Sequence, residues 1–139
     1  MKYLAFLTAV FLVGCGSDDE GSPATLSDIV GVWDESITEG QLVDEMYTVI
    51  AEDGTVTGYD YLGDSYDNEA NCYDDYAAGK LTDLGSGNFE FENGASFYIT
   101  INGNSMTTNG SHEGDSWTFT SERSDRLESS FTPLCNELR

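Results

Sequence analysis

The side chains best suited to chemistry in this chain are three cysteines, one histidine and a large set of carboxylates. The cysteines are Cys15, Cys72 and Cys135, and the histidine is His112. Common hydrolases carry patterns such as Gly-x-Ser-x-Gly or His-Glu-x-x-His, and neither occurs here. Carboxylates are so numerous that no pair stands out as an acid–base couple. The sequence therefore predicts a protein that is not an enzyme and needs no cofactor.

The first cysteine, Cys15, ends a short apolar run near the start of the chain. Lys2 supplies a positive charge, and residues 3–13 are almost all apolar. This run is too short to cross a bilayer, which takes about 20 residues. A charged start, an apolar centre and a small residue such as Gly14 before the cleavage point are typical of a secretion signal. An ordinary cleaved signal and a buried helix are the alternatives to a lipoprotein signal.

Leu12-Val13-Gly14-Cys15 resembles the lipobox of bacterial lipoproteins, Leu-x-Gly/Ala-Cys. The resemblance implies that Cys15 carries a diacylglycerol and usually a further acyl chain. Because each buried methylene contributes about 0.8 kcal/mol, several chains would anchor the protein permanently. In lipoproteins of many Gram-negative bacteria, Asp directly after the cysteine is the signal for retention in the inner membrane. This chain has Gly16 at that position, so the resemblance favours the outer membrane. Ser17-Asp18-Asp19-Glu20 also resembles the surface-export signal of Bacteroidetes lipoproteins. The resemblance implies a cell-envelope protein of the outer membrane, on its periplasmic or surface face.

The chain divides by composition into three parts. Residues 1–14 are the expected signal peptide, residues 15–24 an anchored acidic tether, and residues 25–139 a single small domain. The tether is expected to be disordered because it has no large apolar residue.

The formal net charge of −21 limits the classes of partner that the protein can bind. Such a charge argues against nucleic acid and anionic lipid headgroups as partners. It fits a soluble domain in a salty medium, and it also fits binding of divalent cations or of a cationic partner. Beyond the membrane reached through Cys15, the expected partners are a small apolar ligand or another protein.

Cys72 and Cys135 remain as an even pair after Cys15 is assigned. An even pair in an oxidising compartment predicts a disulfide. A zinc site is disfavoured because neither cysteine lies in a Cys-x-x-Cys pair and His112 is the only histidine.

Much of the chain consists of short segments in which apolar and polar residues alternate, as they do in β-strands. Residue pairs that favour tight turns separate these segments. Turns are expected at Asp53-Gly54, Asn93-Gly94 and Asn102-Gly103. A helical turn is expected to begin at Thr25 or Ser27. The expected strands are residues 32–37, 45–50, 55–62, 89–92, 97–101, a short one at Met106, 117–120 and 127–131, with a loop over 109–115.

Consecutive hairpins imply neighbouring antiparallel strands. Closing about eight strands into a barrel removes the exposed edges that an open sheet would leave. The expected fold is therefore all-β, a small antiparallel up-and-down β-barrel, with a sandwich as the alternative.

Gly31-Val32-Trp33, after a short helical turn, resembles the Gly-x-Trp motif that opens lipocalins and related calycin barrels. Asp53-Gly54-Thr55 stands where small lipocalin-like domains of bacterial lipoproteins often have Asp-Gly-Thr. The resemblance implies that Trp33 plugs the closed end of the barrel. It also implies that an arginine of the last strand packs across this ring, either Arg123 or Arg126.

The segment from Tyr59 to Tyr76 departs from the regular pattern. Its tyrosines are Tyr59, Tyr61, Tyr66, Tyr73 and Tyr76, and its carboxylates include Asp60, Asp64, Asp67 and Glu69. One interpretation is a solvated rim loop pinned by a disulfide at Cys72. The tyrosines could instead form a recognition surface, and the four carboxylates could be calcium ligands. The spacing does not match an EF-hand.

Two functional classes follow from these patterns. The first is a non-catalytic binding module that holds a small apolar or amphiphilic ligand at the barrel mouth. The second is a structural or interaction lipoprotein with a filled barrel and an acidic, tyrosine-rich rim. A wide apolar cavity favours the first, and a core filled by its own side chains favours the second.

We predict that Cys15 is lipidated. Metabolic labelling with a fatty-acid analogue is expected to label the wild-type protein, and Cys15→Ser is expected to abolish the label and release the protein from the membrane. A wild-type protein that takes up no label would end the lipoprotein interpretation.

Overall fold

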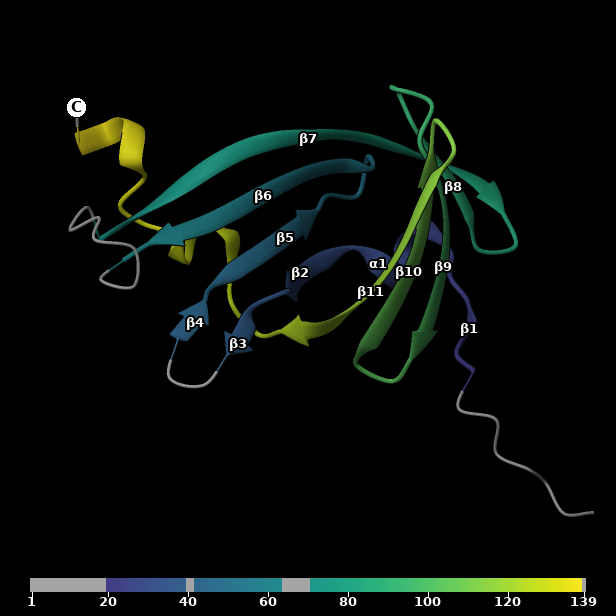
Figure 1. The fold of residues 1–139 in the computed structure, drawn as a ribbon, viewed down its shortest axis with the longest axis horizontal. Helices are drawn as coiled ribbons and strands as arrows, with labels where there is room; N and C mark the ends of the chain where they lie inside the picture. Colours follow the sequence, from purple (N-terminus) through teal and green to yellow (C-terminus); the bar gives the residue numbers. More distant parts are fainter. Residues whose placement is uncertain (1–19, 40–41, 64–70, 139) are drawn as a thin grey trace, which may run out of the picture.

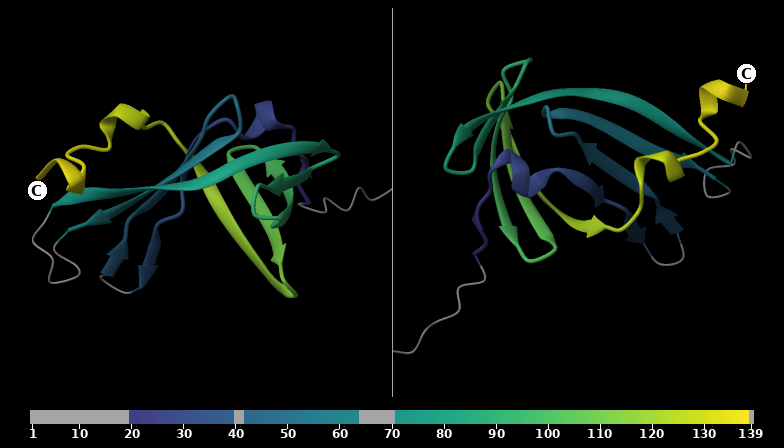
Figure 2. Two further views of the ribbon diagram at one scale, coloured as in Figure 1. Left: turned by 90° about the horizontal axis from the view of Figure 1, so that it is seen from above. Right: turned by 180° about the vertical axis from the view of Figure 1, so that it is seen from behind.

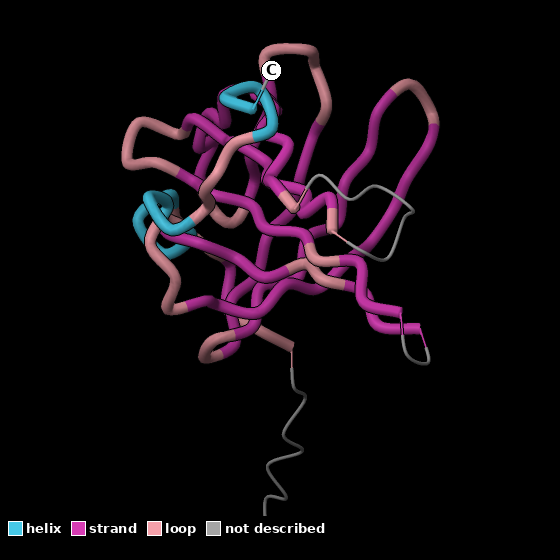
Figure 3. The backbone as a smooth tube through the Cα atoms, turned by 90° about the vertical axis from the view of Figure 1, so that its left-hand side faces the viewer, coloured by secondary structure: helices cyan, strands magenta, loops and turns pink. Residues whose placement is uncertain are grey.

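The computed structural model describes residues 20–39, 42–63 and 71–138. Strands make up most of these residues, and helical segments are few and short (Figure 3). The strands are β1 (Ser22–Pro23), β2 (Gly31–Asp34), β3 (Ile37–Glu39), β4 (Leu42–Asp44), β5 (Met46–Ile50), β6 (Thr55–Leu62), β7 (Cys72–Gly85), β8 (Asn88–Phe91), β9 (Ser96–Asn102), β10 (Ser105–His112) and β11 (Asp115–Ser124). The helical segments are α1 (Leu26–Ile29) and two 3-10 helices, Glu128–Ser130 and Cys135–Leu138.

Eight of these strands close into an antiparallel barrel (Figure 1). Following the chain, β2, β5, β6, β7, β8, β9, β10 and β11 each pair with the next, and β11 returns to pair with β2. The hairpin of β3 and β4 is inserted between β2 and β5 in the chain, and β1 pairs antiparallel with β9 at Thr100 and Ile101 as an addition to the barrel. The predicted fold class, a small up-and-down β-barrel, is confirmed.

The tight turns lie where the sequence predicts them. Between β5 and β6, Asp53 accepts a hydrogen bond from the Thr55 backbone N–H at 2.9 Å. Gly54 has a φ of +87°, and a Cβ there would lie 2.3 Å from the carbonyl oxygen of Leu81. A side chain at this position would therefore clash with the neighbouring strand. Asn93 supports the β8–β9 turn in the same way, accepting from the Ala95 N–H at 2.9 Å.

The short helix α1 begins after Thr25, one of the two predicted starting points. The Thr25 backbone N–H donates to Asp28 Oδ2 at 2.7 Å, and the Thr25 hydroxyl donates to the same oxygen at 2.7 Å. These bonds fix the first turn, because Asp28 partners the residue that starts the helix. The chain then enters β2 directly, and this places Trp33 beneath α1.

Three predictions about strands are wrong. Residues 72–85 form the longest strand of the barrel, β7, where no strand was expected beyond residue 62 until Phe89. β10 extends to His112, so the predicted loop over 109–115 is mostly strand. Residues 127–131 contain a 3-10 turn instead of a strand, because a turn brings Phe131 back onto the barrel, where its side chain is buried.

The barrel wall separates two apolar clusters. The inner cluster lies inside the barrel and consists of Ala24, Ile29, Trp33, Ile50, Val56, Leu81, Phe89, Ile99 and Met106. The outer cluster covers the outside of β2, β5, β6 and β7 with Val32, Tyr47, Val49, Tyr59, Tyr73 and Phe131. Val49 and Ile50 belong to different clusters, as the two-residue period of a strand requires.

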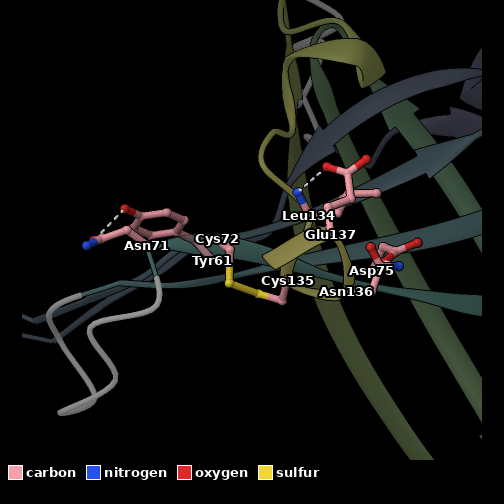
Figure 4. Close-up of a disulfide and its surroundings, with 8 residues drawn as sticks. All are labelled: Tyr61, Asn71, Cys72, Asp75, Leu134, Cys135, Asn136 and Glu137. Atoms are coloured by element: carbon pink, nitrogen blue, oxygen red, sulfur yellow. Dashed lines mark hydrogen bonds between the residues drawn. A yellow bond between two sulfur atoms is a disulfide. The ribbon is translucent and has the colours of Figure 1, made fainter. Parts of the chain in front are cut away.

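The C-terminal segment closes over the outer cluster and is bonded to β7 (Figure 2). Cys72 at the start of β7 forms a disulfide with Cys135, with 5.0 Å between their Cα atoms (Figure 4). Next to it, the Tyr73 N–H donates to the Pro133 carbonyl at 2.9 Å. The predicted disulfide is confirmed, and it ties the chain end to β7 next to Tyr73, a member of the outer cluster.

We predict that removing this disulfide lowers the free energy of unfolding by about 4 kcal/mol, since it closes a loop of 63 residues. The double variant Cys72→Ala/Cys135→Ala is measured by urea unfolding beside the wild type, each with and without reducing agent. Reduction is expected to destabilise only the wild type. Equal stability of the oxidised wild type and the double variant would contradict the prediction.

Candidate functional site

A cavity of about 170 Å³ lies inside the barrel. Most of its wall is apolar, with Ile50, Val56, Leu81, Phe91, Ile99 and Met106 among the side chains that line it. The polar side chains of its wall are Glu35, Thr48 and Thr108. An apolar cavity of about 150 Å³ suffices to bind benzene in an engineered protein. The volume and the lining therefore suit a small, largely apolar molecule.

The barrel end beneath α1 is closed by Trp33. Its ring is fully buried, and its indole N–H donates to the Ile29 carbonyl at 2.8 Å. The Arg123 guanidinium carbon lies 4.3 Å from the centroid of the ring. Arg123 also donates to the carbonyls of Asp28 and Val30, at 2.6 and 3.0 Å. The Arg123 side chain, stacked on the Trp33 ring, thus joins the end of α1 to the last strand, β11.

Arg126, the other arginine proposed for this role, lies in the outer cluster. Its guanidinium carbon is 4.4 Å from the centroid of the Phe131 ring, and its Nη1 lies 3.0 Å from Glu45 Oε1. The same nitrogen donates to the Tyr73 hydroxyl at 2.9 Å. The structure therefore places Arg123 across Trp33, and Arg126 beneath the C-terminal segment.

Glu35 brings a carboxylate to the wall of the apolar cavity. It follows β2 directly and lies two residues after Trp33, on the same side of the extended chain. The Ser121 hydroxyl donates to Glu35 Oε1 at 3.2 Å. Burial raises the pKa of the Glu35 carboxyl, and it outweighs the hydrogen bonds from Thr48 and Ser121, which lower the pKa. Nearby Asp60 raises this pKa further.

Asp60 is a second carboxylate on the inward side of the barrel wall. It alternates along β6 with Tyr59 and Tyr61, which pack outside. Its Oδ1 atom is buried and has no hydrogen-bond partner. Burial, followed by the charges of Asp44 and Asp74, raises the pKa of its carboxyl. The ion pairs among the described residues join Arg126 to Glu45 and His112 to Glu113, so none of them neutralises Glu35 or Asp60.

Aromatic rings lie around the same half of the barrel. Tyr76 crosses Gly58, where a Cβ would lie 2.1 Å from the ring, and burial raises the pKa of its hydroxyl, with smaller contributions from Asp60 and Glu35. Its side chain is 43% exposed. Phe119 lines the cavity and is 38% exposed, so the cavity wall extends to the surface here.

Of the tyrosines that the sequence suggested for a recognition rim, the four that the structure describes do not share one surface. Tyr59 and Tyr73 are each only 7% exposed, and their rings pack on Phe131 at centroid distances of 4.6 and 5.2 Å. The Tyr59 hydroxyl donates to Glu128 at 2.8 Å, and burial raises its pKa to about 12. Tyr61 is half-buried against Tyr73. The expectation of an exposed rim is thus wrong for Tyr59 and Tyr73.

Several predicted site residues lie outside the described part of the chain. These are Cys15, Asp64, Tyr66, Asp67 and Glu69. Within the described ranges, no group of three or more His, Cys, Asp or Glu side chains is placed to hold a metal ion. None of the helices in those ranges has the length and apolar character needed to span a membrane.

Glu35, Ser121 and Thr108 are not among the site residues that the sequence predicts. Glu35 could have been found from the strand period, because it lies two residues after the inward-facing Trp33. No such pattern marked Ser121 or Thr108 as inward-facing, because the predicted strands in these regions did not include them. β11 runs from Asp115 to Ser124, and Thr108 lies at the centre of a strand expected only around Met106.

None of the protein-family models, curated proteins or solved structures compared with this chain matches it. The fold and the cavity therefore define the class of the protein by themselves. It is a closed eight-stranded up-and-down barrel with an apolar cavity and a carboxylate in the cavity wall.

We predict that Glu35→Gln raises the free energy of unfolding at pH 7, by on the order of 1 kcal/mol as for an ordinary single substitution. Because the folded protein raises the pKa of this carboxyl, it binds the proton more tightly than the unfolded chain does. Wild-type stability must then fall as pH rises above about 4.3, the ordinary value, until the raised pKa is passed. Urea unfolding over a pH series measures the effect, and the advantage of the variant is expected to vanish below pH ~4.

The control is Glu90→Gln, which removes the same charge from an exposed side chain on β8. It accounts for the general relief of repulsion in an acidic protein. Equal gains from the two substitutions at pH 7 would show that burial of Glu35 costs nothing.

Proposed function

We propose that this protein is a lipid-anchored envelope lipoprotein whose lipocalin-like barrel binds a small apolar or amphiphilic ligand without transforming it. The observation that carries the proposal is the cavity of about 170 Å³ inside the barrel. Protein cores are normally packed with few voids larger than a water molecule. Unfilled apolar volume beside a polar side chain is a common arrangement in ligand sites.

The cavity limits the size of the ligand. Typical sites for drug-sized ligands measure about 300–1,000 Å³, so a cavity of 170 Å³ suits a smaller molecule. A single aromatic ring with a short substituent, or a short alkyl chain, has the right volume. A long-chain lipid does not fit unless part of it lies outside the barrel.

The alternative function, a filled barrel that presents an acidic tyrosine-rich rim to another protein, has weaker support. The inner cluster leaves the cavity open, and Tyr59 and Tyr73 are buried in the outer cluster. Of the described tyrosines in that set, only Tyr76 is more than a third exposed.

The lipid anchor is supported by the sequence around Cys15. The end of the expected 15–24 tether is part of the fold, because β1 (Ser22–Pro23) pairs with β9 and Ala24 is buried. The tether between the lipid and the barrel would therefore be shorter than the sequence suggested. A short tether would hold the barrel close to the membrane surface.

We predict that the cavity binds a small neutral aromatic such as indole, and that closing the cavity abolishes binding. Ala78→Phe places a ring at an exposed position of the cavity wall, and Thr108→Leu fills a buried one. Each is expected to weaken binding at least tenfold, measured by ligand-observed NMR on protein that carries Cys15→Ser, so that no acyl chain takes up the probe.

The matched control is Ala77→Phe. Ala77 is exposed, precedes Ala78 on β7 and does not line the cavity. Loss of binding in this variant as well, or indole binding that both cavity variants leave intact, would place the probe elsewhere and contradict the proposal.

A further inference from the structure

We propose that the ligand of this cavity is a small organic monocation, such as a primary amine with an aromatic or short alkyl body. The body would occupy the apolar cavity, and the protonated nitrogen would pair with the carboxylate of Glu35. This inference rests on the proposed ligand-binding function and specifies its ligand class.

The first argument is the position of Glu35 in the cavity wall. An apolar molecule alone would gain nothing from a carboxylate there, and it would leave that group poorly solvated. Burying an ionised carboxylate without a counter-charge is costly. A ligand that carries its own positive charge removes this cost and gains a charge-assisted hydrogen bond, which is stronger than a neutral one.

The second argument is the charge around Glu35. The groups whose charges act on it are Asp60 and Asp34, both acidic, and no ion pair among the described residues includes Glu35. Repulsion between these carboxylates disfavours an anionic ligand such as a fatty acid. It favours a cation, and the net charge of −21 would also draw cations towards the barrel.

The third argument is the number of acceptors. Glu35 accepts hydrogen bonds from Ser121 and Thr48, and an ionised carboxylate offers about four acceptor sites. A primary ammonium has three N–H donors, so it can use acceptors that the protein leaves unused. A calcium ion would instead need six or more oxygen ligands, and the largely apolar lining does not offer them.

The aromatic rings of the wall suit the same ligand. Phe91 and Phe97 line the cavity and meet edge to face, with 4.9 Å between their centroids. Phe119 lines it as well. Such rings pack well against an aromatic body, and their faces attract a neighbouring positive charge.

The test compares three probes of similar shape: 2-phenylethylamine, 2-phenylethanol and phenylacetate. Calorimetry or NMR at pH 7 and constant ionic strength is carried out on the protein with Cys15→Ser and on Glu35→Gln and Asp60→Asn in the same background. We expect the amine to bind at least tenfold more tightly than the alcohol, and phenylacetate to bind most weakly. Glu35→Gln is expected to remove the preference for the amine and to leave binding of the alcohol within about threefold.

Asp60→Asn serves as a second variant that alters the charge beside the cavity without altering its wall, and it is expected to reduce the amine preference by a smaller factor. The control Glu90→Gln makes the same change in net charge on the outside and is expected to keep the preference in full. Circular dichroism of each variant confirms the fold before binding is measured.

The outcomes separate this inference from the proposed function. If amine and alcohol bind equally, or if Glu35→Gln keeps the amine preference, the monocation is wrong although the cavity still binds ligands. If no probe binds the folded protein, the ligand-binding function fails as well. Tighter binding of phenylacetate than of the amine would also overturn the inference.

Discussion

The barrel depends on the short seam at which its last strand meets its first. β11 and β2 are joined at three register positions, and the middle one pairs Arg123 with Trp33. The seam is short for a sheet contact, so side chains add to the backbone bonds. Trp33 fills the closed end, and Arg123 stacks on its ring and holds the carbonyls at the end of α1. Closing the seam also removes the two open sheet edges, which would otherwise be exposed.

The two faces of the barrel wall are packed to different degrees. The outer cluster is dense, with the Phe131 ring held among three tyrosines and the chain end fastened at Cys135. The inner cluster is less complete and leaves a cavity. Because the same strands carry both clusters, apolar burial outside stabilises strands whose inner faces are not fully packed. An incompletely filled interior is thus compatible with a domain of this size.

The sequence predicted the parts of the fold that local chemistry determines. Alternating residues gave β6 its bounds, Asp-Gly and Asn-Gly pairs placed the turns, and Trp33 was recognised as a core residue. The sequence failed for β7, because its central Asp, Ala and Gly residues have low strand propensity. Pairing with β6 and burial of Cys72, Tyr73 and Leu81 impose the strand there. Tyr59 and Tyr73 were misplaced for a related reason: the Phe131 that buries them is distant in the chain.

The candidate site follows from a conflict between burial and charge. Glu35 directly follows β2, at an inward position where the strand period calls for an apolar residue. The hydrogen bonds from Thr48 and Ser121 only partly offset its burial. Without a ligand, this conflict raises the pKa of the carboxyl and destabilises the fold. A bound cation would make the Glu35 charge favourable. The carboxylate that opposes folding in the empty barrel would then attract the ligand and be stabilised by it. The group that weakens the empty barrel is therefore the one that would select the ligand.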